Sequence, residues 1–209
     1  MLYILSLIVL MRHGEALNNV KHILTGRRLV YHLTERGKLH VTEACEMLKA
    51  LCIDAIYSSP ITRAVETAEI VSSRLGLPYT IDDRLTETDM GKLTGMNYFD
   101  VVSKYKDLLL RFYSGYDVSE YELENFNSIR RRMLSMLDNV ASKHANKNVL
   151  LITHLDPIKA VIAEMLGVNA EVLLNMKIKT ASLTILSHSS GYQLLAYNVV
   201  SINRYKPEE

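Results

Sequence analysis

The chain has 209 residues, of which 48% are hydrophobic and 22% are charged. This length allows one substantial hydrophobic core and is short for two ordinary domains, so we expect a single domain over residues 1–209. Lysine and arginine total 24 against 23 acidic residues, and the formal net charge is +1. A nearly neutral chain gives no reason to expect nucleic acid or an anionic membrane as its main partner. Any site for anions must therefore come from a local arrangement of charges.

The two cysteines, Cys45 and Cys52, fall in a segment with helical spacing. There they would lie about 10 Å apart along the helix axis, which is too far for a disulfide bond. No spacing typical of a zinc site is present either, so we predict a reducing, cytoplasmic location. The opening run MLYILSLIVLM is short and lacks both a basic leader and a small-residue cleavage site. It indicates a buried strand and not a signal peptide or a membrane span.

Strands and helices alternate along the chain in the predicted order. Apolar or alternating runs predict strands at residues 3–11, 53–59, 79–85 and 148–153 and a hairpin at 182–200. Helical spacing predicts helices at residues 33–51, 61–75 and 157–166 and two or three more within 97–143. Thr34 is the expected N-cap of the first helix, Pro60 is expected near the start of the second, and Gly76 should end it. This order predicts an α/β fold with a mostly parallel central sheet flanked by helices on both faces, with residues 97–143 as a small helical cap.

Residues with catalytic potential follow three of the predicted strands. Arg12 and His13 end the first strand, residues 58–63 with Arg63 follow the second, and His154 follows the strand at 148–153. Ligands of parallel sheets bind beyond the carboxyl ends of the strands, so we expect these groups to meet at one edge. Two arginines and two histidines would form a strongly cationic pocket there, and phosphate suits the fork geometry of arginine.

A pair of histidines suggests chemistry beyond binding. Neutral imidazole is a nucleophile near pH 7, and adjacent cations help to keep it unprotonated, so His13 could attack phosphorus. A leaving alkoxide would then need a proton from a carboxylic acid outside the cationic cluster, for which Glu87 is the best-placed candidate. Gly14 would let the backbone approach the ligand, and Asn19 and Thr25 would offer neutral hydrogen bonds.

Each of these residues also has an ordinary structural interpretation. Arg63 could be a solvated helix residue, His154 a strand-end histidine satisfied by the backbone, and Glu87 a surface carboxylate. An isolated Arg-His-Gly triplet occurs by chance in many proteins. The combination of all these residues favours a common site over the separate alternatives.

Five blocks of the sequence resemble the histidine phosphatase superfamily, also called the phosphoglycerate mutase-like family. In chain order the blocks are RHGEALNN, TGRRLVYHLTERG, IYSSPITRAVETA, RLTETDMGKLTGM and LLITHLDPIKAVI. They occur in the order of the family and over almost the entire chain, so the resemblance is highly specific. It implies a phosphoglycerate mutase-like fold.

The resemblance also implies a role for each matching residue. His13 would be the phosphate acceptor, and Arg12, Arg63 and His154 would hold the phosphoryl oxygens during transfer. Glu87 would protonate the leaving group and later activate water. No metal and no cofactor are implied. The candidates for binding phosphate or substrate are Asn19, Thr25, Gly26 and Leu155.

The sequence departs from the family after the second histidine, where Gly is common and this chain has Leu155 and Asp156. Leu155 would narrow the approach to the pocket, and Asp156 would disfavour a carboxylate-rich substrate if it faces the pocket. The other histidines are interpreted as surface or satisfied polar residues: His22, His32, His40, His144 and His188.

The family contains both hydrolases and sugar-phosphate mutases. We predict a phosphomonoester hydrolase for a small phosphorylated metabolite, because the interval between Glu87 and His154 is shorter than in cofactor-dependent phosphoglycerate mutases. Arg130, Arg131 and Arg132 could grip a substrate carboxylate, although their helical spacing favours a surface role. The alternatives are a cofactor-dependent phosphoglycerate mutase and, less favoured because the catalytic residues are all present, an inactive phosphate-binding module.

The segment at residues 96–125 is rich in tyrosine and is where the choice of substrate should lie. These tyrosines could line a lid over the substrate or pack within a helical cap. The five are Tyr98, Tyr105, Tyr113, Tyr116 and Tyr121. The sequence does not name the substrate, and it leaves open a homodimer formed through the C-terminal hairpin or the apolar N-terminus.

Overall fold

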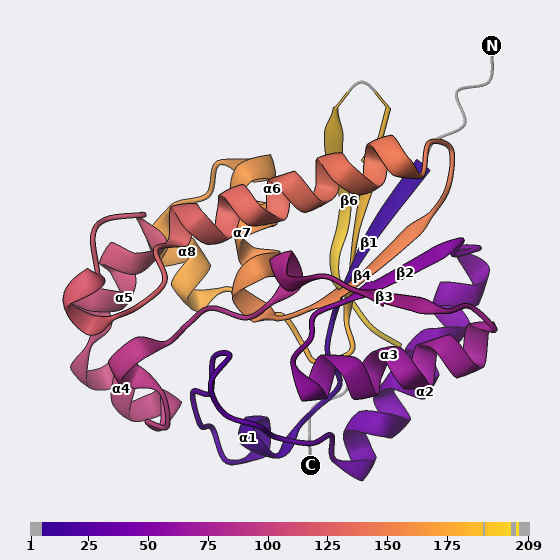
Figure 1. Cartoon of the computed structure of the whole chain (residues 1–209). Helices are drawn as coiled ribbons and strands as arrows, with labels where there is room; N and C mark the ends of the chain where they lie inside the picture. The colour runs from indigo at the N-terminus through magenta and orange to yellow at the C-terminus, as the bar shows by residue number, and fades with distance from the viewer. Residues whose placement is uncertain (1–5, 190, 202–203, 205–209) are drawn as a thin grey trace.

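A six-stranded sheet forms the centre of the protein, which a computed structural model describes for residues 6–189, 191–201 and 204 (Figure 1). The strands are β1 (Ser6–Arg12), β2 (Ala55–Ser58), β3 (Tyr79–Ile81), β4 (Val149–Thr153), β5 (Leu183–His188) and β6 (Tyr192–Val199). Their order across the sheet is β3-β2-β4-β1-β5-β6. The first four strands pair in parallel, whereas β5 is antiparallel to β1 and β6 to β5. The expected α/β fold with a mostly parallel sheet is confirmed.

Helices cover both faces of this sheet because the buried strands are apolar on both sides. The helices are α1 (Leu17–Val20), α2 (Glu35–Ala50), α3 (Thr62–Leu75), α4 (Tyr98–Lys104), α5 (Lys106–Tyr113), α6 (Phe126–Lys143), α7 (Leu155–Leu166) and α8 (Ala170–Asn175). Side chains of β1 alternate between two cores, with Val9 and Met11 on the side of α2 and α3. Ile8 and Leu10 face the side of α6 and α7. Figure 1 shows α6 on one side of the strands and α2 and α3 on the other.

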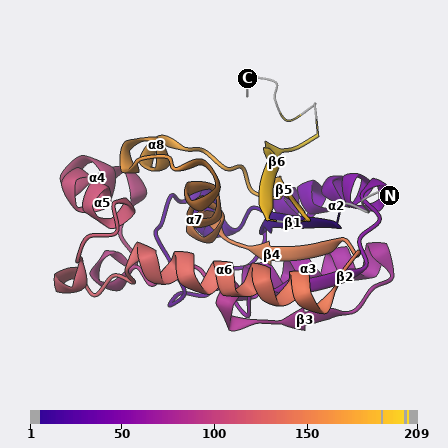
Figure 2. The same cartoon turned by 90° about the horizontal axis from the view of Figure 1, so that it is seen from above.

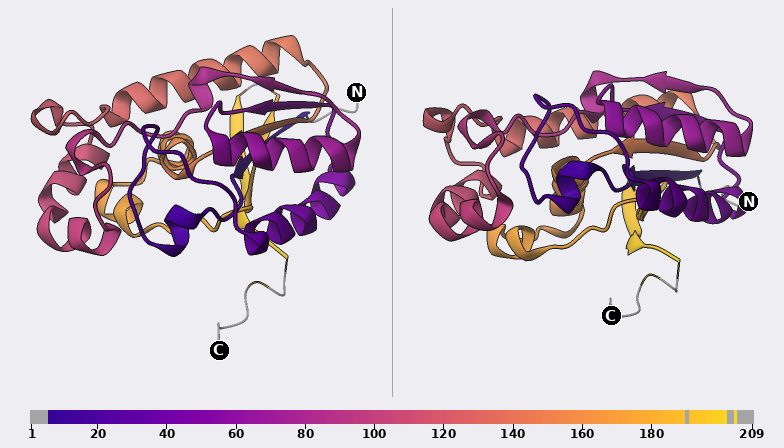
Figure 3. Two further views of the ribbon diagram at one scale, coloured as in Figure 1. Left: turned by 60° about the horizontal axis from the view of Figure 1, so that its bottom comes forward. Right: turned by 90° about the horizontal axis from the view of Figure 1, so that it is seen from below.

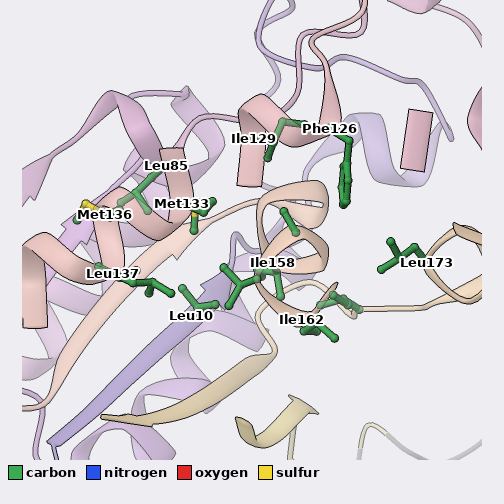
Figure 4. Close-up of a cluster of buried hydrophobic side chains, with 14 of the residues drawn as sticks. Leu10, Leu85, Phe126, Ile129, Met133, Met136, Leu137, Ile158, Ile162 and Leu173 are labelled. Atoms are coloured by element: carbon green, nitrogen blue, oxygen red, sulfur yellow. The ribbon is translucent and has the colours of Figure 1, made fainter. Parts of the chain in front are cut away.

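The core between the sheet and the α6–α7 layer is built from fully buried aliphatic and methionine side chains. Figure 4 shows Leu10 of β1 close to Ile158 and Ile162 of α7, with Met133 and Leu137 contributed by α6. Such packing is as dense as an organic crystal, so it holds the N-terminal end of α7 at a fixed position relative to the end of β1. That position matters because His154 immediately precedes α7.

Several local signals are confirmed. Thr34 Oγ1 accepts a hydrogen bond from the Gly37 N–H at 2.9 Å and is the N-cap of α2. Gly76 ends α3 in a left-handed conformation, with φ of 69°. Pro60 lies near the start of α3 as expected, two residues before Thr62 and next to an extended Ile61.

Some boundaries differ from expectation. Helix α7 begins at Leu155, two residues before the predicted start, because Pro157 is tolerated in the first turn of a helix. The predicted strand at 79–85 is a strand only over Tyr79–Ile81 and then turns into a short 3₁₀ helix. The predicted first strand is observed from Ser6, and its residues 3–5 lie outside the described part of the chain.

The segment at residues 97–143 contains three helices, in agreement with the sequence. α6 belongs to the layer that covers one face of the sheet, whereas α4 and α5 lie beyond the sheet and next to α8 (Figures 1 and 2). The interpretation of residues 97–143 as a cap stays a prediction. Over the described ranges, the structure contains no helix with the length and apolar character needed to cross a membrane.

Gly37 marks a very close contact between α2 and the loop that follows β1. A Cβ atom at this position would lie 2.1 Å from the Glu15 carbonyl oxygen and 2.8 Å from the Glu15 nitrogen. We expect Gly37→Ala to lower the free energy of unfolding by about 2 kcal/mol, because overpacking forces backbone shifts. Thermal and denaturant unfolding would measure this loss.

Gly191→Ala is the matched control, since a Cβ atom at Gly191 meets nothing within 4 Å and its φ is not left-handed. Equal stability of the two variants would contradict the interpretation of Gly37 as a contact residue.

Candidate active site

Three parallel strands end at the same edge of the sheet and bring the predicted residues together. Arg12 is the last residue of β1, Ser58 the last of β2 and Thr153 the last of β4. The pairing registers place Arg12 beside Thr153 and Ser58 beside Ile152. His13 and His154 therefore leave adjacent strands side by side, with ring centroids 5.0 Å apart.

The His13 ring is buried and held in one tautomer. Its Nδ1 lies 2.7 Å from the Gly14 carbonyl oxygen, which can only accept, so Nδ1 carries the proton. Nε2 is then unprotonated, and its lone pair accepts a hydrogen bond from Arg63 Nε at 3.0 Å. Burial, followed by the charges of Arg63 and Arg12, holds the pKa of His13 well below its usual range. The imidazole is therefore neutral at pH 7, with its nucleophilic nitrogen beside a guanidinium.

Arg63 is almost fully buried, although it lies in the first turn of α3. One of its terminal nitrogens donates to the Gly26 carbonyl at 3.0 Å, which ties α3 to the loop after β1. Burial, with a contribution from Arg12, lowers the pKa of Arg63 to about 10, while Glu87 opposes the shift. The side chain thus stays cationic at neutral pH. The alternative of a solvated helix residue is wrong.

Arg12 and His154 complete the cationic side of the site. Arg12 donates through Nη1 to the Ile178 carbonyl, and burial lowers its pKa. His154 is fully buried, and its Nε2 lies 2.8 Å from Ser59 Oγ. Burial and the charge of Arg63 hold the pKa of His154 well below its usual range, so this ring is also neutral.

Three buried nitrogens at this edge have no hydrogen-bond partner within the residues that the structure describes. They are Arg12 Nε, one Nη of Arg63 and Nδ1 of His154. The guanidinium nitrogens can only donate, and buried donors are rarely left unpaired in proteins. A group of unpaired donors beside two cations suits an anion with several oxygen acceptors.

Glu87 provides the one carboxylate predicted for this edge, and it is 7% exposed. Its two oxygens accept backbone hydrogen bonds from Thr88 at 3.0 Å and from Leu155 at 3.2 Å, at the start of α7. Burial and then the neighbouring Asp156 carboxylate raise the pKa of Glu87, against the lowering effect of Arg63 and Arg12. A buried carboxyl with a raised pKa is suited to donating a proton.

A cavity of about 310 Å³ opens onto these groups and is lined by Arg12, His13, Arg63 and Glu87. His154 does not line the cavity and contacts it through the His13 ring. All four predicted binding residues lie in the lining: Asn19, Thr25, Gly26 and Leu155. Figure 3 shows the indigo loop that carries α1 passing beside α7, with α4, α5 and α8 beyond it.

The expectation for Gly14 is wrong. Gly14 does not line the cavity, and a Cβ atom there would lie 2.7 Å from Val41 Cγ2 and 3.0 Å from the Gly37 carbonyl oxygen. Its lack of a side chain therefore allows α2 to pack against the end of β1. The Gly14 N–H donates to Thr67 Oγ1 at 3.0 Å, which links this turn to α3.

The three arginines at 130–132 take no part in the cavity. Arg130 and Arg131 are on the surface side of α6, as expected, whereas Arg132 is largely buried and pairs with Glu124 at 3.0 Å. The expectation of a surface role is wrong for Arg132, because the loop before α6 folds back and places Glu124 beside it.

Two residues of the cavity lining were not firmly predicted from the sequence. His22, interpreted as a surface or satisfied residue, lines the cavity, where its ring packs edge-on against Phe99 with centroids 4.7 Å apart. Asp156 does face the cavity and is 2% exposed. The positive φ of His22 comes from a turn that no apolar pattern marks, so only the tertiary structure reveals its position.

The five tyrosines separate into different roles. Tyr98 lines the cavity, and Tyr113 lines a second cavity next to it. Tyr105 and Tyr121 pack edge-on against each other, and Tyr116 is 67% exposed. Whether these tyrosines lie over a substrate stays a prediction.

Comparison with known proteins supports the same family as the motifs. Residues 8–200 match the histidine phosphatase superfamily (branch 1). A 2,3-bisphosphoglycerate-dependent phosphoglycerate mutase of Thermoplasma acidophilum is 31% identical over 202 residues, which cover 95% of this chain and 94% of that protein. Phosphoserine phosphatase 1 of Hydrogenobacter thermophilus is 30% identical over 163 residues, covering 78% of this chain and 77% of that protein.

Solved structures share the fold. YhfR of Bacillus stearothermophilus matches with a TM-score of 0.82 and 26% identity, over 94% of this chain and 98% of that one. A mycobacterial glucosyl-3-phosphoglycerate phosphatase matches with a TM-score of 0.80 and 25% identity, over 92% and 98%. With the sheet order, the two histidines at adjacent strand ends and the match over residues 8–200, the chain belongs to the histidine phosphatase superfamily.

Proposed function

We propose that this protein hydrolyses phosphate monoesters of small metabolites through a phosphohistidine on His13. The observation that carries the proposal is the buried, neutral His13 ring, whose Nε2 lone pair lies beside Arg63 while Nδ1 is fixed by Gly14. Hydrogen-bonded tautomers of this kind leave one nitrogen free to act as a nucleophile.

The first step transfers the phosphoryl group to the protein. The hydrogen bond from Arg63 Nε to His13 Nε2 breaks, the Nε2 lone pair forms a bond to phosphorus, and the bond between phosphorus and the ester oxygen breaks. Arg12 and Arg63 line the cavity and donate to the phosphoryl oxygens, whose charge is stabilised most strongly where water is excluded. We expect the unpaired Nδ1 of His154 to donate as well, although His154 is not part of the cavity lining. Glu87 gives its proton to the departing oxygen, which leaves as an alcohol.

The second step returns the protein to its starting state. A water molecule loses a proton to the Glu87 carboxylate and forms a bond to phosphorus, while the bond from phosphorus to Nε2 breaks. Phosphate leaves, and Glu87 is protonated again. Because the two arginines supply the positive charge, the proposal needs no metal ion. The free cysteines, Cys45 and Cys52, are consistent with the proposed cytoplasmic location.

His13→Ala should lower phosphate release by about a thousandfold or more, because no other group can replace the nucleophile. The unaltered protein, incubated with ³²P-labelled substrate and quenched in alkali, should carry label that is stable in base and lost in acid. The His13→Ala variant should carry none. Phosphate release that survives His13→Ala would contradict the proposal.

Glu87→Gln should lower hydrolysis of alkyl phosphates by about 10²- to 10⁴-fold, the usual contribution of a general acid. The loss in the first step should be smaller for p-nitrophenyl phosphate, whose leaving group needs no proton. Burst kinetics, which separate the first step from the second, would measure both. Equal losses for the two esters would contradict the assigned acid.

The pH profile follows from the same two groups. The acid must be protonated, so kcat/KM for alkyl esters should fall as pH rises through the raised pKa of Glu87. The lowered pKa of His13 keeps the nucleophile neutral into the acidic range, so the acidic limb should lie well below pH 6.5. In Glu87→Gln the limb due to Glu87 should be absent.

A phosphoglycerate mutase is the second candidate, because the Thermoplasma relative has that name. Two features support the hydrolase over the mutase. Arg132 is occupied by Glu124, and Asp156 places a negative charge in the cavity wall near the phosphate site.

Incubation with p-nitrophenyl phosphate should therefore release phosphate, whereas incubation with 3-phosphoglycerate and the bisphosphate cofactor should give no isomerisation, as measured by phosphorus NMR. Isomerisation without release would replace the hydrolase by the mutase, and binding without either reaction would indicate an inactive module.

A further inference from the structure

A second cavity of about 430 Å³ adjoins the phosphate site and is not used by the proposed chemistry. It shares Arg12, Leu155 and Asp156 with the first cavity, so the two spaces meet along the first turn of α7. We call it the apolar chamber, because most of its lining is aliphatic or aromatic. Its far walls include Leu109 and Phe112 of α5 and Leu174 of α8.

The position of the chamber makes it the space for the alcohol part of a substrate. The ester oxygen must lie near Glu87, which accepts the backbone N–H of Leu155. From there, Leu155 and Asp156 lead into the chamber. Lys159 is one helical turn further along α7, and it lines the chamber but not the phosphate cavity. One turn corresponds to about 5.4 Å, so Lys159 lies on the side away from the phosphate.

Lys159 is an unusual residue for an apolar wall, because it is 3% exposed. Its Nζ donates to Tyr113 Oη at 3.1 Å and lies 4.8 Å from the centre of the Tyr113 ring. Tyr113 Oη in turn donates to Asp156 Oδ1 at 2.8 Å. An ammonium group has three donors, and among the described residues only one of them has an acceptor.

The charge of the chamber is mainly positive. Its lining contains Arg12, Lys159, Lys177 and Lys179 against the single carboxylate of Asp156. Burial lowers the pKa of Lys159 to about 8, so it still carries its charge at neutral pH. A buried ammonium with donors to spare is stabilised by an anion, and the apolar walls favour a ligand that also buries carbon.

We propose that the substrate is a phosphate monoester whose alcohol has an apolar body, the size of an aromatic ring or larger, and a carboxylate at its far end that binds Lys159. The proposal rests on the proposed function of the same site. The apolar body occupies the chamber between α5, α7 and α8. A carboxylate close to the phosphate, as in a small hydroxy acid, meets Asp156 and is disfavoured, whereas a distant carboxylate reaches Lys159.

Three esters test the proposal by calorimetric titration of the His13→Ala protein, which binds without turnover. 4-Carboxybenzyl phosphate has the ring and the distant carboxylate, 4-methylbenzyl phosphate has the ring alone, and 2-phosphoglycolate has the carboxylate without the ring. The first should bind about tenfold more tightly than the second, the factor expected for one charge-assisted hydrogen bond. 2-Phosphoglycolate should bind most weakly.

Lys159→Met, added to His13→Ala, should reduce the preference for 4-carboxybenzyl over 4-methylbenzyl phosphate to about one. The matched control is Lys104→Met, which removes an exposed lysine at the end of α4. It should keep the preference. A structural role for Lys159 in the Tyr113–Asp156 network would instead weaken both benzyl esters alike. A thermal melt checks that the variant is folded.

Equal binding of the two benzyl esters, a preference that survives Lys159→Met, or 2-phosphoglycolate as the tightest ligand would each overturn the proposal. The comparison of the three esters on His13→Ala protein decides the question even if Lys159→Met does not fold. Hydrolysis of 4-methylbenzyl phosphate by the unaltered chain is measured separately. Selective binding without any phosphate release would refute the proposed function, whereas release without selectivity would refute only the assignment of the chamber.

Discussion

The buried hydrogen bond from Arg63 to His13 is the contact on which the rest of the site depends. A guanidinium and an imidazole are both costly to bury, and the two can adjoin only if the imidazole stays neutral. The Gly14 carbonyl makes this possible by holding the proton on the other ring nitrogen. The sheet, the turn after β1 and the first turn of α3 all position these two side chains. A small error in any of them would separate the cation from the lone pair.

The surrounding fold offsets the free-energy cost of burying several positive charges close together. Backbone carbonyls of Gly26 and Ile178 accept from the two guanidinium groups, and Glu87 lies within range of both. Glu87 is itself held by the amide groups at the start of α7. The two arginines and Glu87 thus lower one another's free-energy cost of burial without forming a direct ion pair. Their remaining donors and acceptors stay available to a ligand.

Much of this arrangement could be predicted from the sequence. The apolar runs of β1 and β4 predict buried parallel strands, and parallel strands must present Arg12, His13 and His154 at one edge. The apolar runs also indicate where these strands end, and therefore which residues meet at the edge of the sheet. Chemical reasoning named Glu87, Asn19 and Thr25 as candidates, and the family resemblance gave them roles. Their positions in the cavity lining depend on the folding of long connections.

The remaining features depend on contacts between distant segments. Gly14 was assigned to the ligand because the sequence does not show that α2 packs against it. His22 lines the cavity because of a loop with no periodic pattern, and Arg132 is partly buried beside Glu124, which lies eight residues earlier and folds back toward it. Lys159 is a charged residue within the largely apolar helix α7. Only the placement of α5 shows that it faces a chamber and not solvent.

The carboxylate of Asp156 belongs to two environments at once. It contributes to the raised pKa of Glu87, and it accepts a hydrogen bond from Tyr113 on α5. A change in α5 that alters this hydrogen bond therefore acts on the acid as well as on the shape of the chamber. Under the proposed function, the choice of alcohol and the pH range of hydrolysis are therefore coupled through this one side chain.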